Sequence, residues 1–311
     1  MSLANPALPR RTHAADRRCS GRCFFLSPSR KTNRILGYCL GYALFRHPAV
    51  RLTAFLFHSN HWHLVLSADD GDLSSFFALF NSLVARAMNC HLRRGENLWV
   101  PGGTPKRPIF GVEGIWDQLT YCTVNPVKDG MVESPEAWPG LISLPEDVGT
   151  KTFRFERPEE FFRAEGDDAM PDAVEFTLEP PVELESMDPE EFRREYRERL
   201  DARVAKVHVE RRGKPFMGAQ QIRDQDPLAS AGDTFPDRDR DPRIVCKDKD
   251  QRIGILRWLS EFRFAHRVAY FFWSRGARDT IFPAYTYLMR VRHGVRCRDP
   301  ALFGEAAFAA A

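Results

Sequence analysis

Two runs of β-branched, aromatic and leucine-rich sequence, residues 50–57 and 61–67, are separated by only His58, Ser59 and Asn60. Runs of this length and composition are typical of strands, and so short a connection joins antiparallel neighbours, which predicts a β-hairpin. Directly after it, Asp72 is a good helix N-cap, and apolar residues recur at three- and four-residue steps to about residue 92. The sequence therefore predicts a hairpin followed at once by an amphipathic helix.

Weaker patterns predict further elements on both sides of this hairpin. We expect a short strand at 21–26, a helix at 32–46, a Gly- and Pro-rich loop at 99–108 and helices at 112–124, 188–210 and 253–273. The helix at 112–124 should end at Asn125, because a residue that precedes proline is pushed out of the helical region. Asp188-Pro189 supplies an N-cap and a first-turn proline for the highly charged helix that follows.

The expected elements divide the chain into four parts. Residues 1–20 lack periodicity and are expected to be a disordered basic tail, and residues 21–148 form the domain that carries the candidate site. Residues 149–242 are rich in proline and acids and predict an irregular linker that contains the charged helix at about 188–210. Residues 243–311 predict a helical C-terminal segment.

Positive charge is concentrated at the start of the chain. The net charge is only +3, yet the first 60 residues hold ten Lys or Arg and a single acid, Asp16. This asymmetry indicates a nucleic-acid-binding face near the N-terminus, the alternative being a basic tail without a specific role.

Seven cysteines are scattered along the chain, and only Cys19 and Cys23 lie close together, so no four-ligand zinc site is indicated. The sequence shows no secretory signal and no run near the roughly 20 apolar residues that a membrane span requires. We therefore expect a cytoplasmic protein with reduced thiols and no membrane contact.

The first candidate site is His61-Trp62-His63, at the start of the second hairpin strand. Side chains alternate across a strand, so His61 and His63 point the same way and Trp62 points to the opposite face. Two imidazoles in this arrangement are well placed to bind one divalent cation. By itself the pattern also fits two surface or hydrogen-bonded histidines, and core packing is the better interpretation of Trp62.

The second candidate site lies about 60 residues downstream. Tyr121 and Asn125 are four residues apart, so they share one face near the end of the helix expected there. The Asn125 amide oxygen is a hard ligand that suits Mg²⁺ or Mn²⁺, and the Tyr121 phenol can attack phosphorus once it loses its proton. By itself, Tyr121 also fits a core tyrosine with a satisfied hydroxyl.

Taken in order, these pieces resemble a known family. The matching segments are residues 57–66 (Phe-His-Ser-Asn-His-Trp-His-Leu-Val-Leu), 70–74 (Asp-Gly-Asp-Leu-Ser), 96–99 (Glu-Asn-Leu-Trp), 121–132 (Tyr-Cys-Thr-Val-Asn-Pro-Val-Lys-Asp-Gly-Met-Val) and Trp138-Pro139. Their order and spacing resemble the single-tyrosine HUH transposases, in particular the REP-associated branch. The resemblance covers about residues 20–140, and the remainder resembles the tail of a longer branch of bacterial transposase-like proteins.

The resemblance implies a fold, a metal and a reaction. The implied fold is α+β, with a small antiparallel sheet flanked by helices in a ferredoxin-like HUH core and a mainly helical C-terminal extension. His61 and His63 would be metal ligands, Asn125 the third ligand and Tyr121 the nucleophile. The implied reaction is Mg²⁺- or Mn²⁺-dependent cleavage of single-stranded or hairpin DNA through a 5′-phosphotyrosine, followed by strand transfer. A single tyrosine requires two successive reactions or a homodimer, and such a protein would be nucleoid-associated.

DNA would be held by phosphate contacts and by stacking on aromatic rings. The candidate basic residues flank the two sites: Arg22, Arg30, Lys31, Arg86, Lys106, Arg107 and Lys128. Trp62 and Trp99 are further candidates as stacking platforms, although core packing is the better interpretation of Trp62. Three other interpretations stay open: a relaxase or replication initiator, a non-catalytic or domesticated DNA-binding protein derived from a transposase, and a zinc hydrolase.

Overall fold

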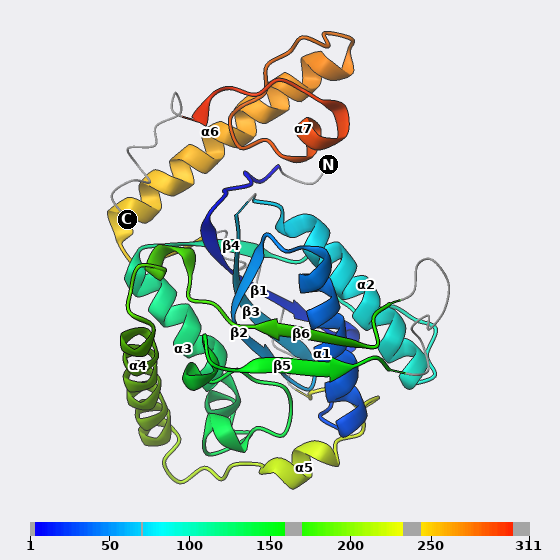
Figure 1. Cartoon of the computed structure of the whole chain (residues 1–311), viewed down its shortest axis with the longest axis vertical. Helices are drawn as coiled ribbons and strands as arrows, with labels where there is room; N and C mark the ends of the chain where they lie inside the picture. The colour runs from blue at the N-terminus through cyan, green and yellow to red at the C-terminus, as the bar shows by residue number, and fades with distance from the viewer. Residues whose placement is uncertain (1–3, 70, 159–169, 233–243, 301–311) are drawn as a thin grey trace.

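A five-stranded sheet forms the centre of the computed structural model, which describes residues 4–69, 71–158, 170–232 and 244–300 (Figure 1). The strand order is β2-β3-β1-β4-β7, in which β7 runs parallel to β4 and the other neighbours are antiparallel. The strands are β1 Arg11–Arg18, β2 Val50–Phe57, β3 His61–Ala68, β4 Lys106–Phe110 and β7 Val245–Cys246, and a separate hairpin pairs β5 Thr152–Glu156 with β6 Ala173–Thr177. The predicted α+β class is confirmed, with one parallel strand added at the sheet edge.

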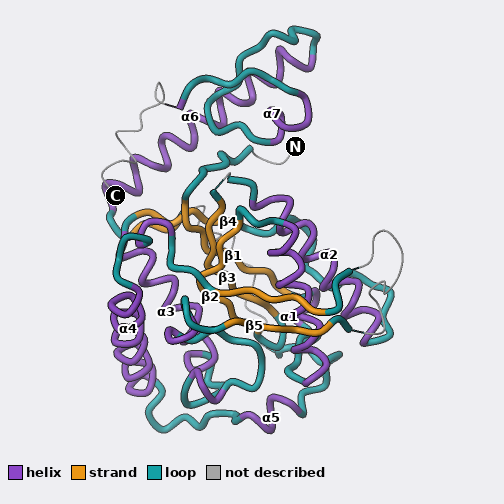
Figure 2. The backbone as a smooth tube through the Cα atoms, viewed as in Figure 1, coloured by secondary structure: helices purple, strands orange, loops and turns teal. Residues whose placement is uncertain are grey.

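Helices enclose the sheet on both sides (Figure 2). They are α1 Arg30–Arg46, α2 Leu73–His91, α3 Val112–Lys128, α4 Pro189–Glu210, α5 Ala219–Arg223, α6 Lys249–Ser274 and α7 Leu288–His293. The fully buried Trp62 ring stacks on Phe77 of α2 with centroids 5.6 Å apart, which places α2, with α1 beside it, on one face of the sheet. The opposite face carries α3, against which α4 packs.

The hairpin and its following helix are confirmed. β2 and β3 pair along their whole length, with one register irregularity between Leu52 and Ala54. The Asp72 carboxylate accepts a hydrogen bond from the Ser75 backbone N–H, as expected of an N-cap. The second predicted cap is also present, since Asp188 accepts from the backbone N–H groups of Glu190 and Glu191.

The expected disordered tail at residues 1–20 is wrong over its second half. Residues 11–18 form β1, which lies between β3 and β4 in the sheet. This strand was missed because its sequence, Arg-Thr-His-Ala-Ala-Asp-Arg-Arg, has little hydrophobic character of its own. Neighbouring strands on both sides satisfy its backbone hydrogen bonds, and this pairing outweighs weak local propensity.

Three further local expectations are corrected. Residues 21–26 form no strand, because the N–H groups of Phe24 and Leu26 donate to the separate carbonyls of Ala229 and Ser59. The loop expected at 99–108 ends in β4, which pairs with β1. The helix expected to stop at Asn125 continues through Pro126 to Lys128, because Val124 and Val127 pack in an apolar cluster with residues of α4.

The irregular linker expected at 149–242 contains regular structure. Its charged helix is confirmed as α4, while the β5–β6 hairpin was not expected. The hairpin packs on α1, where glycines permit close approach: a Cβ on Gly37 would lie 2.3 Å from the Phe155 ring. Part of the linker, residues 159–169 and 233–243, lies outside the described residues.

The C-terminal segment is mainly helical over the part that the structure describes. α6 and α7 pack around Phe282 and Val295, and the N-terminal residues 4–8 lie against this part through Leu8 and a hydrogen bond from the Ala7 N–H to the Tyr285 carbonyl. Figure 1 shows α6 and α7 extending beyond one end of the sheet. None of the described helices is both long and apolar enough to cross a bilayer.

Candidate metal and tyrosine site

Three histidines meet at the turn between β2 and β3. His61 and His63 are half-buried on the same face of β3, as predicted, while the buried His58 lies at the end of β2. The His58 and His61 rings stack with centroids 4.7 Å apart, and the His61 and His63 rings meet edge-on at 4.8 Å. The hairpin therefore gathers three imidazoles, of which His61 and His63 were expected from the sequence.

α3 brings Tyr121 and Asn125 to the same place. The Tyr121 ring lies edge-on to the His63 ring, with centroids 5.6 Å apart. The Asn125 side-chain nitrogen is 3.3 Å from His63 Nε2. Because α3 continues through Pro126, both side chains belong to a regular helical face rather than to a frayed end. The four predicted residues, His61, His63, Tyr121 and Asn125, thus lie together although about 60 residues separate the two motifs.

Burial keeps the imidazoles of this site neutral. It lowers the pKa of His63 to about 3, with further lowering from His58, Arg107 and Lys128, and it lowers the pKa of His58 and His61 well below the ordinary histidine value. His61 Nδ1 lies 2.7 Å from the Asn60 amide oxygen, an arrangement in which Nδ1–H donates and Nε2 keeps its lone pair. A neutral imidazole with a fixed tautomer is the form that binds a metal ion.

Two buried polar atoms in the site lack a protein partner. Asn125 Oδ1 and His58 Nε2 are both shielded from solvent, and neither has a hydrogen bond among the described residues. A buried oxygen or nitrogen without a partner is unfavourable by about 1–3 kcal/mol, and a bound cation would satisfy it. The donor set therefore fits a divalent ion.

The structure offers two overlapping ligand sets that share His61. The set expected from the sequence is His61, His63 and Asn125. The second consists of His58, His61 and Asp129, whose ligand atoms all lie within 4.8 Å of one another. Asp129 follows α3 directly, its carboxylate is 3.8 Å from His58 Nε2, and burial raises its pKa although Lys128 and Arg211 act to lower it.

Two cations flank the candidate nucleophile. Lys128 Nζ lies 4.8 Å from the centre of the Tyr121 ring, and the Arg203 guanidinium carbon lies 5.6 Å from it. Arg203 belongs to α4 and is held in place by hydrogen bonds to Asp117 and to Thr120. No signal in the sequence identified Arg203, because only the packing of α4 on α3 brings it to the site.

The unexpected strand β1 forms a further side of the site. Asp16 pairs with His63 and Arg18 with His61 across the β1–β3 ladder, so these side chains share the face of the histidines. Asp16 also forms an ion pair with Arg107 of β4. Asp16, the single acid among the first 60 residues, therefore neutralises Arg107 beside the site.

The seven basic residues proposed to contact DNA do not form one cluster. Lys128 and Arg107 lie beside the site, and the Arg22 carbonyl accepts a hydrogen bond from the Asn60 side chain at the turn. Lys106 points the other way, toward the Ser74 hydroxyl of α2 at 2.7 Å. The remaining three lie on the helices that cover the opposite face: Arg30 and Lys31 on α1 and Arg86 on α2.

The two candidate stacking tryptophans belong to the core. Trp62 is buried, as expected from its position on the strand. Trp99 is 7% exposed, and its indole N–H donates to the Asn81 carbonyl at 3.0 Å. Neither ring is available to a nucleic-acid base without rearrangement.

No protein-family model matches the sequence, and no curated protein matches it significantly. Among solved structures, the chain is similar to one described as a REP-associated tyrosine transposase bound to a REP hairpin. The match has a TM-score of 0.41 and 18% sequence identity, and it covers 48% of this chain and 86% of that one. Similarity at this level does not establish a family, so the chemistry of the site has to be judged from its own geometry.

Proposed function

We propose that this chain is a divalent-metal-dependent enzyme that cuts and rejoins single-stranded DNA through a covalent bond to Tyr121. The observation that carries the proposal is the convergence of a tyrosine, neutral imidazoles and an unpartnered amide oxygen from β3 and α3. A core tyrosine would not require two unpartnered polar atoms and two cations around it. The transposase-like order of the motifs supports the same chemistry.

In the proposed reaction, the Tyr121 oxygen forms a bond to the phosphorus of a phosphodiester, and the bond from phosphorus to the 3′-oxygen breaks. The phenol proton is transferred, directly or through water, to the departing 3′-oxygen, which leaves as a hydroxyl. The 5′-phosphate stays on Tyr121 as a diester. A 3′-hydroxyl from another strand can reverse the step, so joining needs no external energy source.

His61, with either His63 and Asn125 or His58 and Asp129, would hold Mg²⁺ or Mn²⁺. The ion would neutralise charge that develops on the phosphate and polarise its oxygen. Lys128 and Arg203, which both lie near the Tyr121 ring, would stabilise the phenolate and hold the phosphate near it. Both cations belong to rigid helices, so little reorganisation is needed during the reaction.

A denaturing gel tests this proposal directly. The full-length protein is incubated with Mn²⁺ and a labelled pool of single-stranded hairpins with randomised loops, and we expect a band in which the label is covalently attached to the protein. Tyr121→Phe should abolish the band. Tyr42→Phe is the matched control, because Tyr42 lies on α1 on the opposite face, and it should leave the band unchanged. An adduct that persists in Tyr121→Phe would refute the nucleophile.

One observation favours a second candidate function. A zinc hydrolase is one of the interpretations that the sequence leaves open, and His58 and Asp129 complete with His61 a two-histidine, one-carboxylate set that also suits Zn²⁺. Such an enzyme would hydrolyse a phosphodiester without attaching to it. The same gel separates the two functions, because metal-dependent cleavage with no covalent band would favour the hydrolase.

A further inference from the structure

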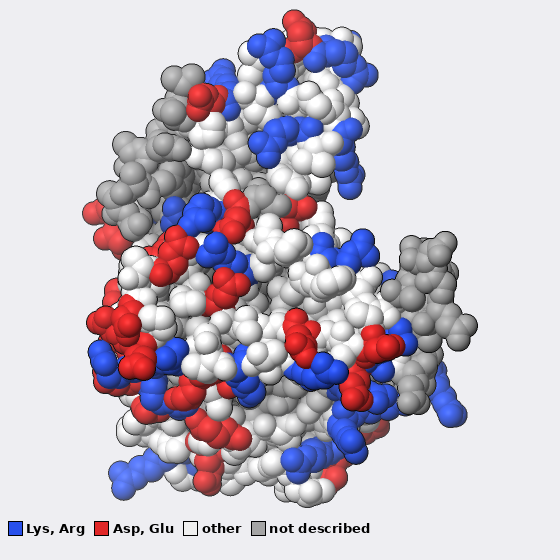
Figure 3. Space-filling view, in the orientation of Figure 1, with Lys and Arg blue, Asp and Glu red and all other residues white. Residues whose placement is uncertain are grey.

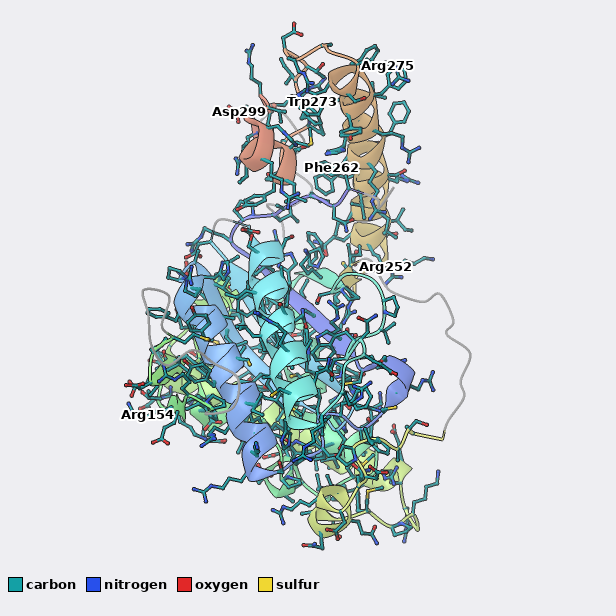
Figure 4. The ribbon with its side chains drawn as sticks, turned by 90° about the vertical axis from the view of Figure 1, so that its right-hand side faces the viewer. Arg154, Arg252, Phe262, Trp273, Arg275 and Asp299 are labelled. Atoms are coloured by element: carbon teal, nitrogen blue, oxygen red, sulfur yellow. The ribbon has the colours of Figure 1, made fainter. Side chains whose placement is uncertain are left out.

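The outer side of α6 is an apolar stripe that no other part of the described chain covers. Its inner side is packed through Ile255, Leu259, Phe262 and Ala269. The outer residues fall on one face of the helix and are exposed: Ile253, Leu256, Phe264, Val268 and Phe271. Phe264 alone is 68% exposed. In Figure 4, Phe262 and Trp273 lie between α6 and the segment that carries α7.

The same stripe carries arginines between its apolar residues. Arg257, Arg267 and Arg275 fall on the outer side and are exposed. The Arg275 guanidinium lies 3.6 Å from the centre of the Phe271 ring. The surface therefore offers flat rings and positive charge side by side.

Positive charge is in large excess over negative charge on this part of the molecule. Residues 263–298 contain eight arginines and a single acid, Asp279. Among the described residues, seven exposed arginines form no ion pair with a carboxylate: Arg257, Arg267, Arg275, Arg278, Arg290, Arg292 and Arg296. The arginines of α4 differ, since Arg197 pairs with Glu146 and Arg199 pairs with Glu113. Figure 3 shows this contrast as mixed charge over α4 and mainly Lys and Arg over α6 and α7.

We propose that the outer side of α6, with the arginines of residues 275–296, binds single-stranded nucleic acid by phosphate contacts and base stacking. This combination of rings and unpaired cations is the one that sequence-independent single-strand binding uses. The stripe from residue 253 to 275 spans about 33 Å at the helical rise of about 1.5 Å per residue, enough for several nucleotides. The choice of DNA over RNA depends on the function proposed above.

The surface begins beside the candidate site. Lys247, two residues before α6, lies 3.5 Å from the Asp117 carboxylate, and Asp117 also holds Arg203 near Tyr121. A strand that leaves the site on this side would meet the start of α6. Two other ligands fit this surface less well. A second copy of the chain would bring unpaired arginines together. A helix that binds a membrane surface keeps its cations on a separate polar face, whereas here arginines lie between the apolar residues.

The test measures binding of full-length protein to a labelled hairpin that carries a single-stranded arm of about 16 nucleotides, a length within the usual site sizes. Phe264→Ala and Phe271→Ala should each weaken binding roughly 5- to 150-fold, the loss expected for one stacking ring. The double variant Arg267→Gln and Arg275→Gln should reduce the slope of log affinity against log salt by about 1.4. The matched controls Phe45→Ala and Arg194→Gln, exposed residues on α1 and α4, should change neither quantity.

Further outcomes decide between the occupants. Unchanged affinity in the Phe and Arg variants would overturn the proposal. So would a wild-type dimer that Phe264→Ala dissociates with no loss of DNA binding, or wild-type binding to phosphatidylserine vesicles but not to DNA. Formation of the covalent adduct on a hairpin without the arm should be unchanged in these variants. If no adduct forms in the wild type while arm binding still depends on Phe264 and Phe271, the catalytic proposal fails and the binding surface stands.

Discussion

Replacing Asn125 by leucine should make the metal-free protein more stable while removing its response to metal. The Asn125 side chain is 2% exposed, its Oδ1 has no partner, and its Nδ2 makes one long contact of 3.3 Å to His63. Leucine has the same number of side-chain heavy atoms, so the cavity and packing change little. The variant loses a hydrogen bond of about 0.5–1.5 kcal/mol and removes an unsatisfied oxygen that is unfavourable by about 1–3 kcal/mol.

The expected net effect on the metal-free protein is a gain of about 1 kcal/mol in the free energy of unfolding. For a chain of this size, that gain corresponds to a rise of about 2 °C in Tm. Wild-type protein should gain about 2.7 kcal/mol when Mn²⁺ is present at 100 times its Kd, because the ion binds only the folded state. In Asn125→Leu most of this second gain should disappear. Thermal melts with EDTA and with a Mn²⁺ titration measure both quantities on the same samples.

Asn81 provides a matched control on the opposite face of the sheet. It is also a buried helical asparagine with an unpartnered Oδ1, but its Nδ2 donates two good hydrogen bonds, to the Phe77 carbonyl at 2.8 Å and to the Thr104 hydroxyl at 2.9 Å. Asn81→Leu should therefore lower Tm and leave the Mn²⁺ shift intact. The reasoning is refuted if Asn125→Leu lowers Tm as Asn81→Leu does, or if it keeps the full shift. Loss of the shift only in Asp129→Asn would place the ion on the second ligand set.

Three other predictions concern charge, packing and pH. Lys128→Met should slow adduct formation by Tyr121 on the order of 10- to 100-fold at saturating metal, since it removes a cation beside the phenol, with Tm unchanged. Gly37→Ala should destabilise the protein by about 1–3 kcal/mol in urea melts, because its Cβ would overlap the half-buried Phe155 ring, whereas Gly254→Ala on exposed helix should stabilise it by about 1 kcal/mol. Burial lowers the pKa of His13 to about 4, so its unfolded state binds the proton first, and about 3 kcal/mol of stability should be lost as pH falls from about 6.5 to about 4.

Each of these has an outcome that contradicts it. Unchanged single-turnover rates in Lys128→Met would show that this cation takes no part in the reaction. Equal urea midpoints for the two alanine variants would mean that α1 and the β5–β6 hairpin can move apart without any loss of stability. For pH, His13→Asn keeps a donor to the neighbouring backbone carbonyl but cannot titrate. If its stability falls with acid as steeply as that of wild type, other groups account for the loss.

The part of the site that the sequence predicted consists of residues whose positions follow from local geometry. Alternation along β3 placed His61 and His63 on one face and Trp62 on the other. The four-residue spacing of Tyr121 and Asn125 placed them on one face of α3, even though the predicted end of that helix was wrong. In both cases the regular repeat of a strand or a helix determines the direction in which the side chain points.

The residues that the sequence analysis missed depend on contacts between distant segments. His58 and Asp129 approach only because α3 packs across the end of the β2–β3 hairpin. Arg203 reaches Tyr121 because α4 packs on α3, more than 80 residues along the chain from Thr120, to which it is hydrogen-bonded. Local periodicity does not predict which helix packs on which, because this depends on which apolar faces bury each other in the fold.

The sequence by itself determined the hairpin, the helices with clear caps and the direction of the four predicted site residues, because each follows from hydrophobic period and capping chemistry within a few residues. Only the tertiary structure decided that residues 11–18 are a strand inside the sheet and that Asp16 and Arg18 border the site. Such a strand is stabilised mainly by backbone hydrogen bonds to its neighbours, and backbone groups are the same for every sequence. The helix at 253–273 was expected from its apolar period, but only the fold showed that one of its sides is left uncovered.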